Sequence, residues 1–421
     1  MAVLAKAGRF ADTGRIVLVP VLLLFAAVLT AAVMAYGTHP AWAQFPHGLE
    51  FILLARRLQW PLVAVSLLLC LALLGLVIAG RRRAWWLIGL GPVLALFVHR
   101  FATDPANRFH CVETPPFALA SEARHVADDD WVVALQFEDV HYAYPYAALF
   151  EAPVVIHADH DKRVALLWSA YANRAVAVRV GRELRAADLE VVSMPANALL
   201  VYNGRIGRFV NGVTGRTPEG ARPDGFREPL VSVTKTTWRA WRERHPDGKV
   251  MLPVGRAYAT SPRGPIVPAY PLPAPLGPAA AGAGFVLVGA RQPLAIPGTT
   301  VTAAPLDVTA DGVPALVFRD PADGTVRAYE RRVDGVPPQF RANPDRGRRP
   351  KAMFIDDYAG AGWSAHGVAV DGPKGVRGKR LPRLAVDEGL HLGVMRHAYP
   401  EISVWGQQVG APAPATQPTG D

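Results

Sequence analysis

The sequence predicts an N-terminal α-helical transmembrane region followed by a β-rich exported domain, mostly β with short helices (α+β), that is duplicated. Three observations favour this fold class. The long apolar runs lie before Arg100 in a chain of 421 residues. The rest of the chain carries short β-branched segments between turns rich in Pro and Gly. Matching segments also recur in the same order on both sides of a proline-rich stretch.

Three apolar runs predict a membrane anchor over residues 1–100. Residues 16–36 and 61–80 hold no charged side chain, and each is long enough for the hydrocarbon core, which needs about 20 residues. The third run, 84–98, is shorter, but it can cross if the basic residues at its ends reach the interface. A re-entrant or buried helix is the alternative for this third run.

Basic residues beside these runs predict their orientation. Lys6, Arg9 and Arg15 precede the first run, and three arginines at 81–83 separate the second from the third. Both clusters are cytoplasmic if the N-terminus is cytoplasmic, as the enrichment of Lys and Arg in cytoplasmic loops requires. Three crossings then place the chain after Arg100 outside. We therefore expect a protein of the inner (cytoplasmic) membrane with a large extracytoplasmic, periplasmic domain.

Two features of the first loop leave alternatives open. Arg56 and Arg57 fall outside the cytoplasm in this topology, and an amphipathic piece over 49–58 that lies on the membrane surface would accommodate them. Ala41-Trp42-Ala43 resembles a signal-peptidase site. The preceding apolar run is longer than a usual signal core, which favours an uncleaved anchor. Cleavage would leave the large domain on the same side.

The region after Arg100 divides by composition. Apolar β-branched segments predict strands over 131–137, 154–157, 163–168 and 175–180, and 236–245 predicts a short helix. We expect an irregular lead-in over 101–130, a first β-rich repeat over 131–255, a proline-rich linker over 256–283, a second β-rich repeat over 284–405 and a disordered tail over 406–421.

The two predicted repeats share short segments at a near-constant offset. Ala152-Pro153 returns as Ala304-Pro305, and the strand over 164–168 returns as 315–319. A duplicated β-rich unit explains this order, with the two copies packed together around a pseudo-twofold axis.

Several segments resemble a known family. Residues 313–335, Trp363 and 392–405 are similar to the second half of the bacterial domain-of-unknown-function 3179 family, and His141-Tyr-Ala-Tyr-Pro145 and 238–248 are similar to its first half. The resemblance spans about 131–405 and implies no established activity. The chain is a divergent member, because it lacks the Cys-Pro-Leu-Cys motif that the family usually carries. The corresponding positions are Ser169, Ala170, Tyr171 and Ala172.

One polar turn and one cysteine are the candidates for a chemical role. His157, Asp159, His160 and Asp161 put two imidazoles and two carboxylates in one turn, which can bind a divalent metal; a solvated polar turn is the alternative. Cys111 is the single cysteine after the apolar runs, and it can be a reactive thiol, a ligand or a buried structural residue.

The sequence holds no nucleotide fingerprint or intact catalytic motif. We therefore expect no bound cofactor and assign no catalytic residue.

The net charge of +10 narrows the partners. Outside the cytoplasm we expect no nucleic acid, so the membrane, an envelope protein or an anionic envelope component are the partners that fit. The leading hypothesis is a membrane-anchored extracytoplasmic binding or accessory module of the bacterial envelope, without catalysis. The alternative is a redox or metal-dependent accessory enzyme that uses Cys111 or the His157/His160 cluster.

The predicted topology can be tested with reporters fused after Asp421. A reporter that works only in the periplasm should be active there, because three crossings place the domain outside. A cytoplasm-only reporter should be silent. Activity of the cytoplasmic reporter instead would mean that the third run does not cross.

Overall fold

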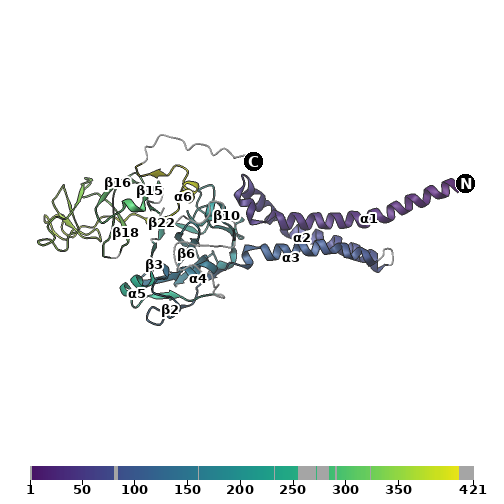
Figure 1. Cartoon of the computed structure of the whole chain (residues 1–421), viewed down its shortest axis with the longest axis horizontal. Coiled ribbons are helices and arrows are strands. Elements are labelled where there is room, and N and C mark those ends of the chain that lie inside the picture. Colours follow the sequence, from purple (N-terminus) through teal and green to yellow (C-terminus); the bar gives the residue numbers. More distant parts are fainter. Residues whose placement is uncertain are drawn as a thin grey trace.

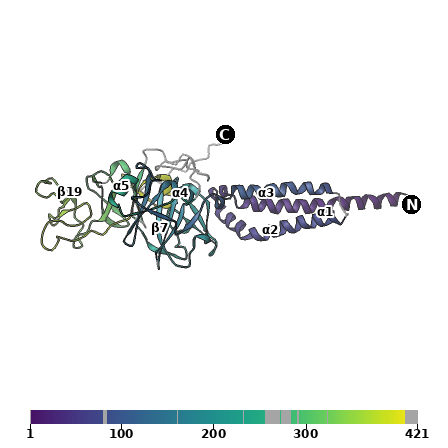
Figure 2. The same cartoon turned by 90° about the horizontal axis from the view of Figure 1, so that it is seen from below.

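A bundle of long helices is joined end to end to a β-rich region (Figures 1 and 2). The structure is a computed structural model that describes residues 2–79, 84–159, 161–231, 233–254, 272, 284–289, 292–322 and 324–406. The first half of the β-rich region, as used below, comprises residues 111–254, and the second half comprises residues 284–406.

Three helices of the bundle are long and apolar enough to cross a membrane over Leu18–Gly37, Gly48–Ile78 and Trp85–Thr103. The elements are α1 (Ala2–Gly37), the 3-10 helix η1 (Pro40–Gln44), α2 (Gly48–Ile78), the 3-10 helix η2 (Ala84–Leu90) and α3 (Gly91–Thr103). The third helix runs beyond the expected end at Val98, because Arg100 forms an ion pair with Asp104 one turn later.

The segment 49–58 is not a separate amphipathic helix on the membrane surface, which corrects the expectation from sequence. It is the first third of α2 and packs against the β-rich region, where Ile52 meets Val192 and Leu200 in one apolar cluster. Arg56 forms an ion pair with Glu190, and its guanidinium lies 5.2 Å from the centre of the Tyr202 ring. Arg56 is one of the two arginines that the predicted topology places outside the cytoplasm. Its contacts with Glu190 and Tyr202 therefore hold the helical anchor against the β-rich region.

The first half contains three sheets. In the order in which strands pair, the sheets are β1-β5-β6-β7-β11, β12-β3-β4-β13-β2 and β10-β9-β8. The strands are β1 (Cys111–Glu113), β2 (Phe117–Leu119), β3 (Trp131–Phe137), β4 (Val140–Pro145), β5 (Val154–Asp159), β6 (Lys162–Ser169), β7 (Arg174–Val180), β8 (Leu189–Ser193), β9 (Leu200–Asn203), β10 (Arg208–Asn211), β11 (Phe226–Val231), β12 (Val233–Thr237) and β13 (Lys249–Met251). The helices are α4 (Tyr146–Glu151), η4 (Ala186–Asp188), η5 (Pro195–Asn197) and α5 (Trp238–Arg244), and the 3-10 helix η3 (Pro105–Asn107) precedes this half.

The second half also contains three sheets, ordered β22-β14-β15-β23, β16-β17-β18 and β19-β20-β21. The strands are β14 (Phe285–Val288), β15 (Leu294–Pro297), β16 (Leu306–Ala310), β17 (Val313–Arg319), β18 (Val326–Glu330), β19 (Phe340–Ala342), β20 (Phe354–Asp356), β21 (Gly362–Trp363), β22 (Val386–Leu390) and β23 (Ser403–Val404). The helices are η6 (Gly298–Thr300) and α6 (Leu392–Ala398).

One sheet in each half has the same strand order and the same strand directions. The hairpin β3-β4 has β12 antiparallel on one side and β13 parallel on the other. The hairpin β14-β15 has β22 antiparallel on one side and β23 parallel on the other. A short helix covers each sheet: Trp238 and Trp241 of α5 pack on Val132, and Met395 of α6 packs on Leu287.

The opposite face of each of these sheets meets a second sheet. In the first half, Val133 and Leu135 of β3 share a core with Ile156 and Leu167 of the sheet that contains β5 and β6. In the second half, Val286 and Ile296 share a core with Val317 of β17. Burial on both faces explains why these strands read as continuous apolar runs rather than as clean alternation.

The two halves meet at a buried cluster of three charges. Asp387 of β22 accepts from Arg174 of β7 and from Lys235 of β12, and both N–O distances are 2.7 Å. The three side chains are between 1% and 9% exposed. Nearby, the Asn173 side-chain amide donates to the carbonyl of Gly389 at 3.2 Å. Gly389 has a φ of +74°, and a Cβ there would lie 2.9 Å from that amide nitrogen. This contact between the two halves therefore requires glycine at position 389.

The region 101–130 is not an irregular lead-in, which is a second correction. The end of α3, η3, β1 and β2 lie in it, and β1 pairs in parallel with β5 while β2 pairs with β13. These strands are only three residues long, too short for an alternating pattern to be visible in sequence. The expected linker 256–283 lies outside the described residues apart from Leu272, which is buried in the core of the first half. Of the expected tail 406–421, only Gly406 is described.

The buried charge cluster makes a testable contribution to stability. Asp387→Ala should lower the free energy of unfolding by about 3–5 kcal/mol, because two buried cations lose their counter-charge. Denaturant unfolding of the detergent-solubilised chain, followed by tryptophan fluorescence, would measure it. Asp334→Asn is the control, because it removes a charge that pairs with Lys379 at the surface and keeps a residue type tolerated at the φ of +54° of this position; it should cost less than about 1 kcal/mol. Equal losses in the two variants would contradict this account.

Candidate functional site

A groove of about 740 Å³ lies between the two halves and is the candidate site. On one side it is lined by β3, β4, β12 and the end of α5. On the other side it is lined by the turn between β17 and β18 and by loops of the second half. Its polar lining consists of Gln136, His141, Thr234, Thr236, Arg244, His245, Asp320, Thr325, Arg327, His366 and Arg383.

The described lining of this groove carries more positive than negative charge. Among the residues that the structure describes, three arginines, Arg244, Arg327 and Arg383, line it, together with one carboxylate, that of Asp320. Asp320 is 3% exposed, and it accepts a hydrogen bond from Arg327 Nε at 3.0 Å. The buried carboxylate therefore neutralises and orients one guanidinium and leaves the lining with an excess of positive charge. Such a surface attracts anions.

Two imidazoles form one wall of the groove. The rings of His141 and His245 stack with centroids 3.8 Å apart. The pKa of His245 is lowered to about 4 by burial, by His141 and by Arg244. The His245 ring is therefore neutral near pH 7, when it can both donate and accept hydrogen bonds. On the opposite wall the His366 ring lies 3.3 Å from an Arg327 nitrogen, measured from Nδ1.

Local structure explains how these side chains reach the groove. His245 follows the last residue of α5, and its backbone N–H closes the helix on the carbonyl of Trp241. His366 precedes Gly367, which has a φ of +69°, and a Cβ there would lie 2.7 Å from the Tyr329 ring. Glycine thus lets the loop cross that ring, which places the neighbouring histidine at the rim.

The buried charge cluster lies directly under this groove. A small cavity of about 20 Å³ shares Thr234 and Thr325 with the groove and also touches Lys235 and Asp387. Burial lowers the pKa of Lys235, and Asp387 opposes that effect. The buried charge cluster that joins the two halves therefore also holds in place the strands at the floor of the groove.

The residues of the predicted metal turn do not share one environment. His157 is 5% exposed and sits among the rings of Phe117, Phe137 and Tyr142, with centroids 4.3–5.4 Å away. Asp161 faces the opposite way and pairs with Arg182 at the surface. Asp159 ends β5, and His160 lies outside the described residues.

Burial lowers the pKa of His157 to about 4, so the ring is a neutral part of an aromatic core. Among the residues that the structure describes, no group of three His, Cys, Asp or Glu is arranged to hold a metal. The full set of four includes His160 and stays a prediction.

Cys111 and the tryptophan pair belong to the interior. Burial raises the pKa of the Cys111 thiol to about 12, which keeps it protonated and therefore a weak nucleophile. Trp238 is fully buried and Trp241 is 2% exposed, so the pair is part of the core. Of the two, Trp241 also borders the groove.

Ser169 and Ala172 lie beside the buried charge cluster. They are the positions that correspond to the two cysteines of the family's motif. Ser169 ends β6, and its buried hydroxyl accepts from the backbone of Leu199 at 3.0 Å. Ala172 lies in the following turn and packs on Ala198 and on Val394 of α6. The next residues along the chain, Asn173 and Arg174, reach across to the second half.

The groove residues were not identified from the sequence as a site. They come from segments more than two hundred residues apart, and their types are ordinary for exposed loops. A partial signal existed, because His141, His245 and Arg327 all lie in the segments that carry the family resemblance. The basic loop over 374–383, which ends in Arg383, was also visible as a charge excess.

Comparison with known proteins establishes the family. Residues 106–389 match the family described as a protein of unknown function, DUF3179, and the chain belongs to this family. The matched range contains every residue of the groove lining. No curated protein matches the chain, and no solved structure matches it.

The buried histidine makes stability depend on pH. The pKa of His157 is about 4 when folded and about 6.5 in an unfolded chain, so the unfolded state binds more protons between these values. Stability should therefore be full above pH 6.5 and fall as the pH drops toward 4. His157→Phe should flatten this dependence in unfolding experiments at several pH values.

A surface histidine provides the control for this measurement. His110→Phe removes an exposed ring and should leave the steepness of the pH dependence as in the unaltered chain. An equal flattening in both variants would show that the aromatic cage of His157 is not the cause.

Proposed function

We propose that this protein is a membrane-anchored module of the cell envelope that binds an anionic envelope component in the groove between its halves. The observation that carries the proposal is the lining of that groove, whose described residues include three arginines, three histidines and one carboxylate. That carboxylate is committed to Arg327. A ligand that bridges the halves would meet Arg244 on one wall and Arg327 and Arg383 on the other.

The hydrogen-bond donors that line the groove indicate which chemical groups the ligand carries. Guanidinium groups bind phosphate and carboxylate through parallel N–H···O bonds. Thr234, Thr236 and Thr325 add hydroxyls to the same lining. An anionic polymer that carries phosphate or carboxylate groups matches this arrangement better than an apolar ligand does. The groove is also open at the surface, as binding of a segment of a chain requires.

The expected orientation is part of the proposal. The free end of α1 and the end of α2 at Ile78 lie at the far end of the bundle from the β-rich region (Figure 1). Lys6, Arg9 and Arg15 belong to that end of α1, and the arginines at 81–83 follow Ile78 in the sequence. The enrichment of basic residues in cytoplasmic loops supports a cytoplasmic location of this end. The groove would then face the space outside the inner membrane.

We also infer that the two halves are copies of one unit. The matching sheets β12-β3-β4-β13 and β22-β14-β15-β23 support this inference, as do the equivalent helices α5 and α6. On this basis the groove is formed where two related units face each other, with different side chains contributed by each.

Binding of fluorescently labelled polyphosphate, measured by anisotropy with the solubilised full-length chain, tests the proposal. Polygalacturonate serves as a carboxylate probe beside it. We expect binding of at least one polymer, weakening with added salt because the contacts are charged. Arg244→Ala and Arg383→Ala should each lower affinity about tenfold, the loss of one hydrogen bond to a charged group.

Two variants with the same change of charge serve as controls. Arg341→Ala and Arg377→Ala remove exposed arginines that are not part of the groove lining, and affinity should stay within about twofold. Equal weakening by groove and control variants would show that only overall charge attracts the polymers. Failure of the unaltered chain to bind either probe would also overturn the proposal.

A further inference from the structure

A second pocket lies at the junction between the helical bundle and the β-rich region. It encloses about 620 Å³ between the first turn of α2, the loops after η5 and β10, and the end of α6. It is separate from the groove, with which it shares no lining residue. Leu49 and the segment 397–399 lie outside the family match at 106–389, so this pocket is lined partly by residues beyond the matched range.

The helix lengths place the pocket near the expected membrane surface. The apolar stretch of α1 ends at Gly37, and its 20 residues span about 30 Å, the thickness of the hydrocarbon core. η1 follows within three residues and contacts both α2 and η5. Pro195 of η5 and Leu49 of α2 then form one side of the pocket. With this stretch of α1 across the membrane, as expected from its length, the pocket begins at the level of the lipid headgroups.

Exposed aromatic residues mark the same level independently. Trp42 is 40% exposed, Phe45 is 59% exposed and Phe51 is 41% exposed. The rings of Phe51 and Phe45 both contact that of Trp42, with centroids 5.2 Å and 5.9 Å from its centroid. Aromatic side chains are enriched at membrane–water interfaces, where one part of the ring is apolar and another is wet.

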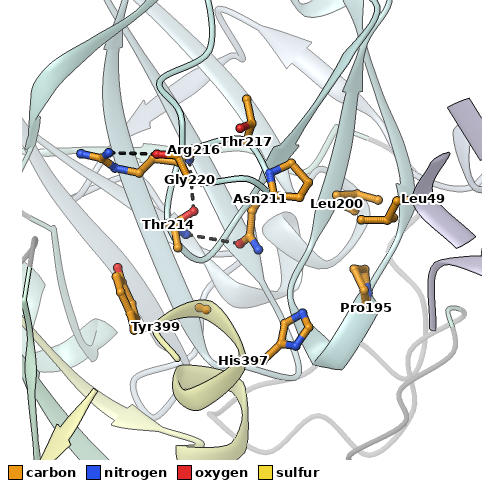
Figure 3. A pocket seen from close by; sticks show the side chains of 12 residues that line it. Leu49, Pro195, Leu200, Asn211, Thr214, Arg216, Thr217, Gly220, His397 and Tyr399 are labelled. Carbon is orange, nitrogen blue, oxygen red and sulfur yellow. Dashed lines mark hydrogen bonds between the residues drawn. The ribbon is translucent and has the colours of Figure 1, made fainter. Parts of the chain in front are cut away.

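The two sides of the pocket differ in polarity (Figure 3). Leu49, Leu200 and Pro195 lie on the side of the membrane helix, whereas Arg216, Thr214 and Tyr399 lie on the opposite side. Among the described residues that line the pocket, none is acidic. The polarity thus runs from apolar beside the bundle to hydrogen-bond donors deeper in the domain.

The donors are held in place by the backbone around them. The Thr214 hydroxyl accepts from the backbone N–H of Arg216 at 3.2 Å, and the Thr217 hydroxyl accepts from Ala221 at 3.2 Å. Each hydroxyl keeps its own proton for donation. The Asn211 carbonyl oxygen accepts from Val213 at 2.8 Å, which directs the amide NH₂ away from that turn. Arg216 is fixed by donation to the carbonyl of Gly220 at 3.0 Å.

We propose that this pocket binds the anionic headgroup of a membrane phospholipid, with the phosphate against Arg216 and the threonine hydroxyls. The apolar side, at Leu49 and Leu200, accommodates the glycerol end of the acyl chains. Bound lipid would touch α2, the first half and α6 together. It would therefore stabilise the junction between the anchor and the domain.

The test measures the unfolding temperature of the full-length chain in dodecyl maltoside with added dioleoyl phosphatidylglycerol. We expect a rise that saturates with lipid concentration, and a smaller or absent rise with dioleoyl phosphatidylcholine, which carries no net charge. Soluble glycerol 3-phosphate supplies the headgroup chemistry without the chains and should be much weaker. An equal effect of the two lipids would overturn the proposal, and so would an equal effect of glycerol 3-phosphate.

Single substitutions test whether the lipid binds in this pocket. Arg216→Leu should reduce the apparent affinity for phosphatidylglycerol about tenfold, whereas Arg208→Leu, on the exposed side of β10 and outside the pocket lining, should leave it unchanged. His397→Trp fills the pocket from the exposed surface of α6 and should block lipid binding even if Arg216→Leu proves unstable. An undiminished lipid response in a folded His397→Trp variant would show that the lipid binds elsewhere.

Discussion

The ion cluster of Arg174, Lys235 and Asp387 is the constraint on which the arrangement of the β-rich region depends. Two cations of the first half share one carboxylate of the second half, and all three side chains are buried. A buried charge is tolerated only when its partners are correctly placed, because desolvation costs several kcal/mol for each ion. Displacement of either half would leave charges unpaired, so the cluster admits one relative position. That position also fixes the two walls of the groove above it.

The groove follows from the way in which each half buries its sheet. In both halves one sheet packs on a second sheet through one face and is covered by a short helix on the other. Most of the apolar surface is thereby buried within each half, and the boundary between the halves combines polar groups with one small apolar cluster around Ala172 and Val394. Arginines and histidines at such a boundary stay close to water while the carboxylate of Asp320 is buried beneath them. A polar, positively charged groove is the outcome, and it suits an anionic ligand.

The helical anchor also makes specific contacts with the β-rich region. α2 has 31 residues, about ten more than the hydrocarbon core requires, and the additional turns pack on the sheet of β8, β9 and β10 through Ile52 and Arg56. η1 adds direct bonds, since the Ser193 hydroxyl donates to the carbonyl of Pro40 at 2.7 Å. The groove is therefore held at a set orientation relative to the helices. The pocket at this junction places a lipid-sized space beside the same contact.

The sequence by itself determined the apolar helices, the strands β3, β5, β6 and β7 of the first half and the short helix that carries Trp238 and Trp241. These features depend on local length and periodicity, which are readable without knowledge of the partners. Only the tertiary structure decided that His157 turns into an aromatic core, that β1 and β2 join distant strands, and that 49–58 packs on the domain. It also decided that His141 and Arg244 face Arg327 and Arg383 across one groove. These outcomes depend on long-range contacts, because the environment of a polar side chain is set by neighbours that are distant in sequence.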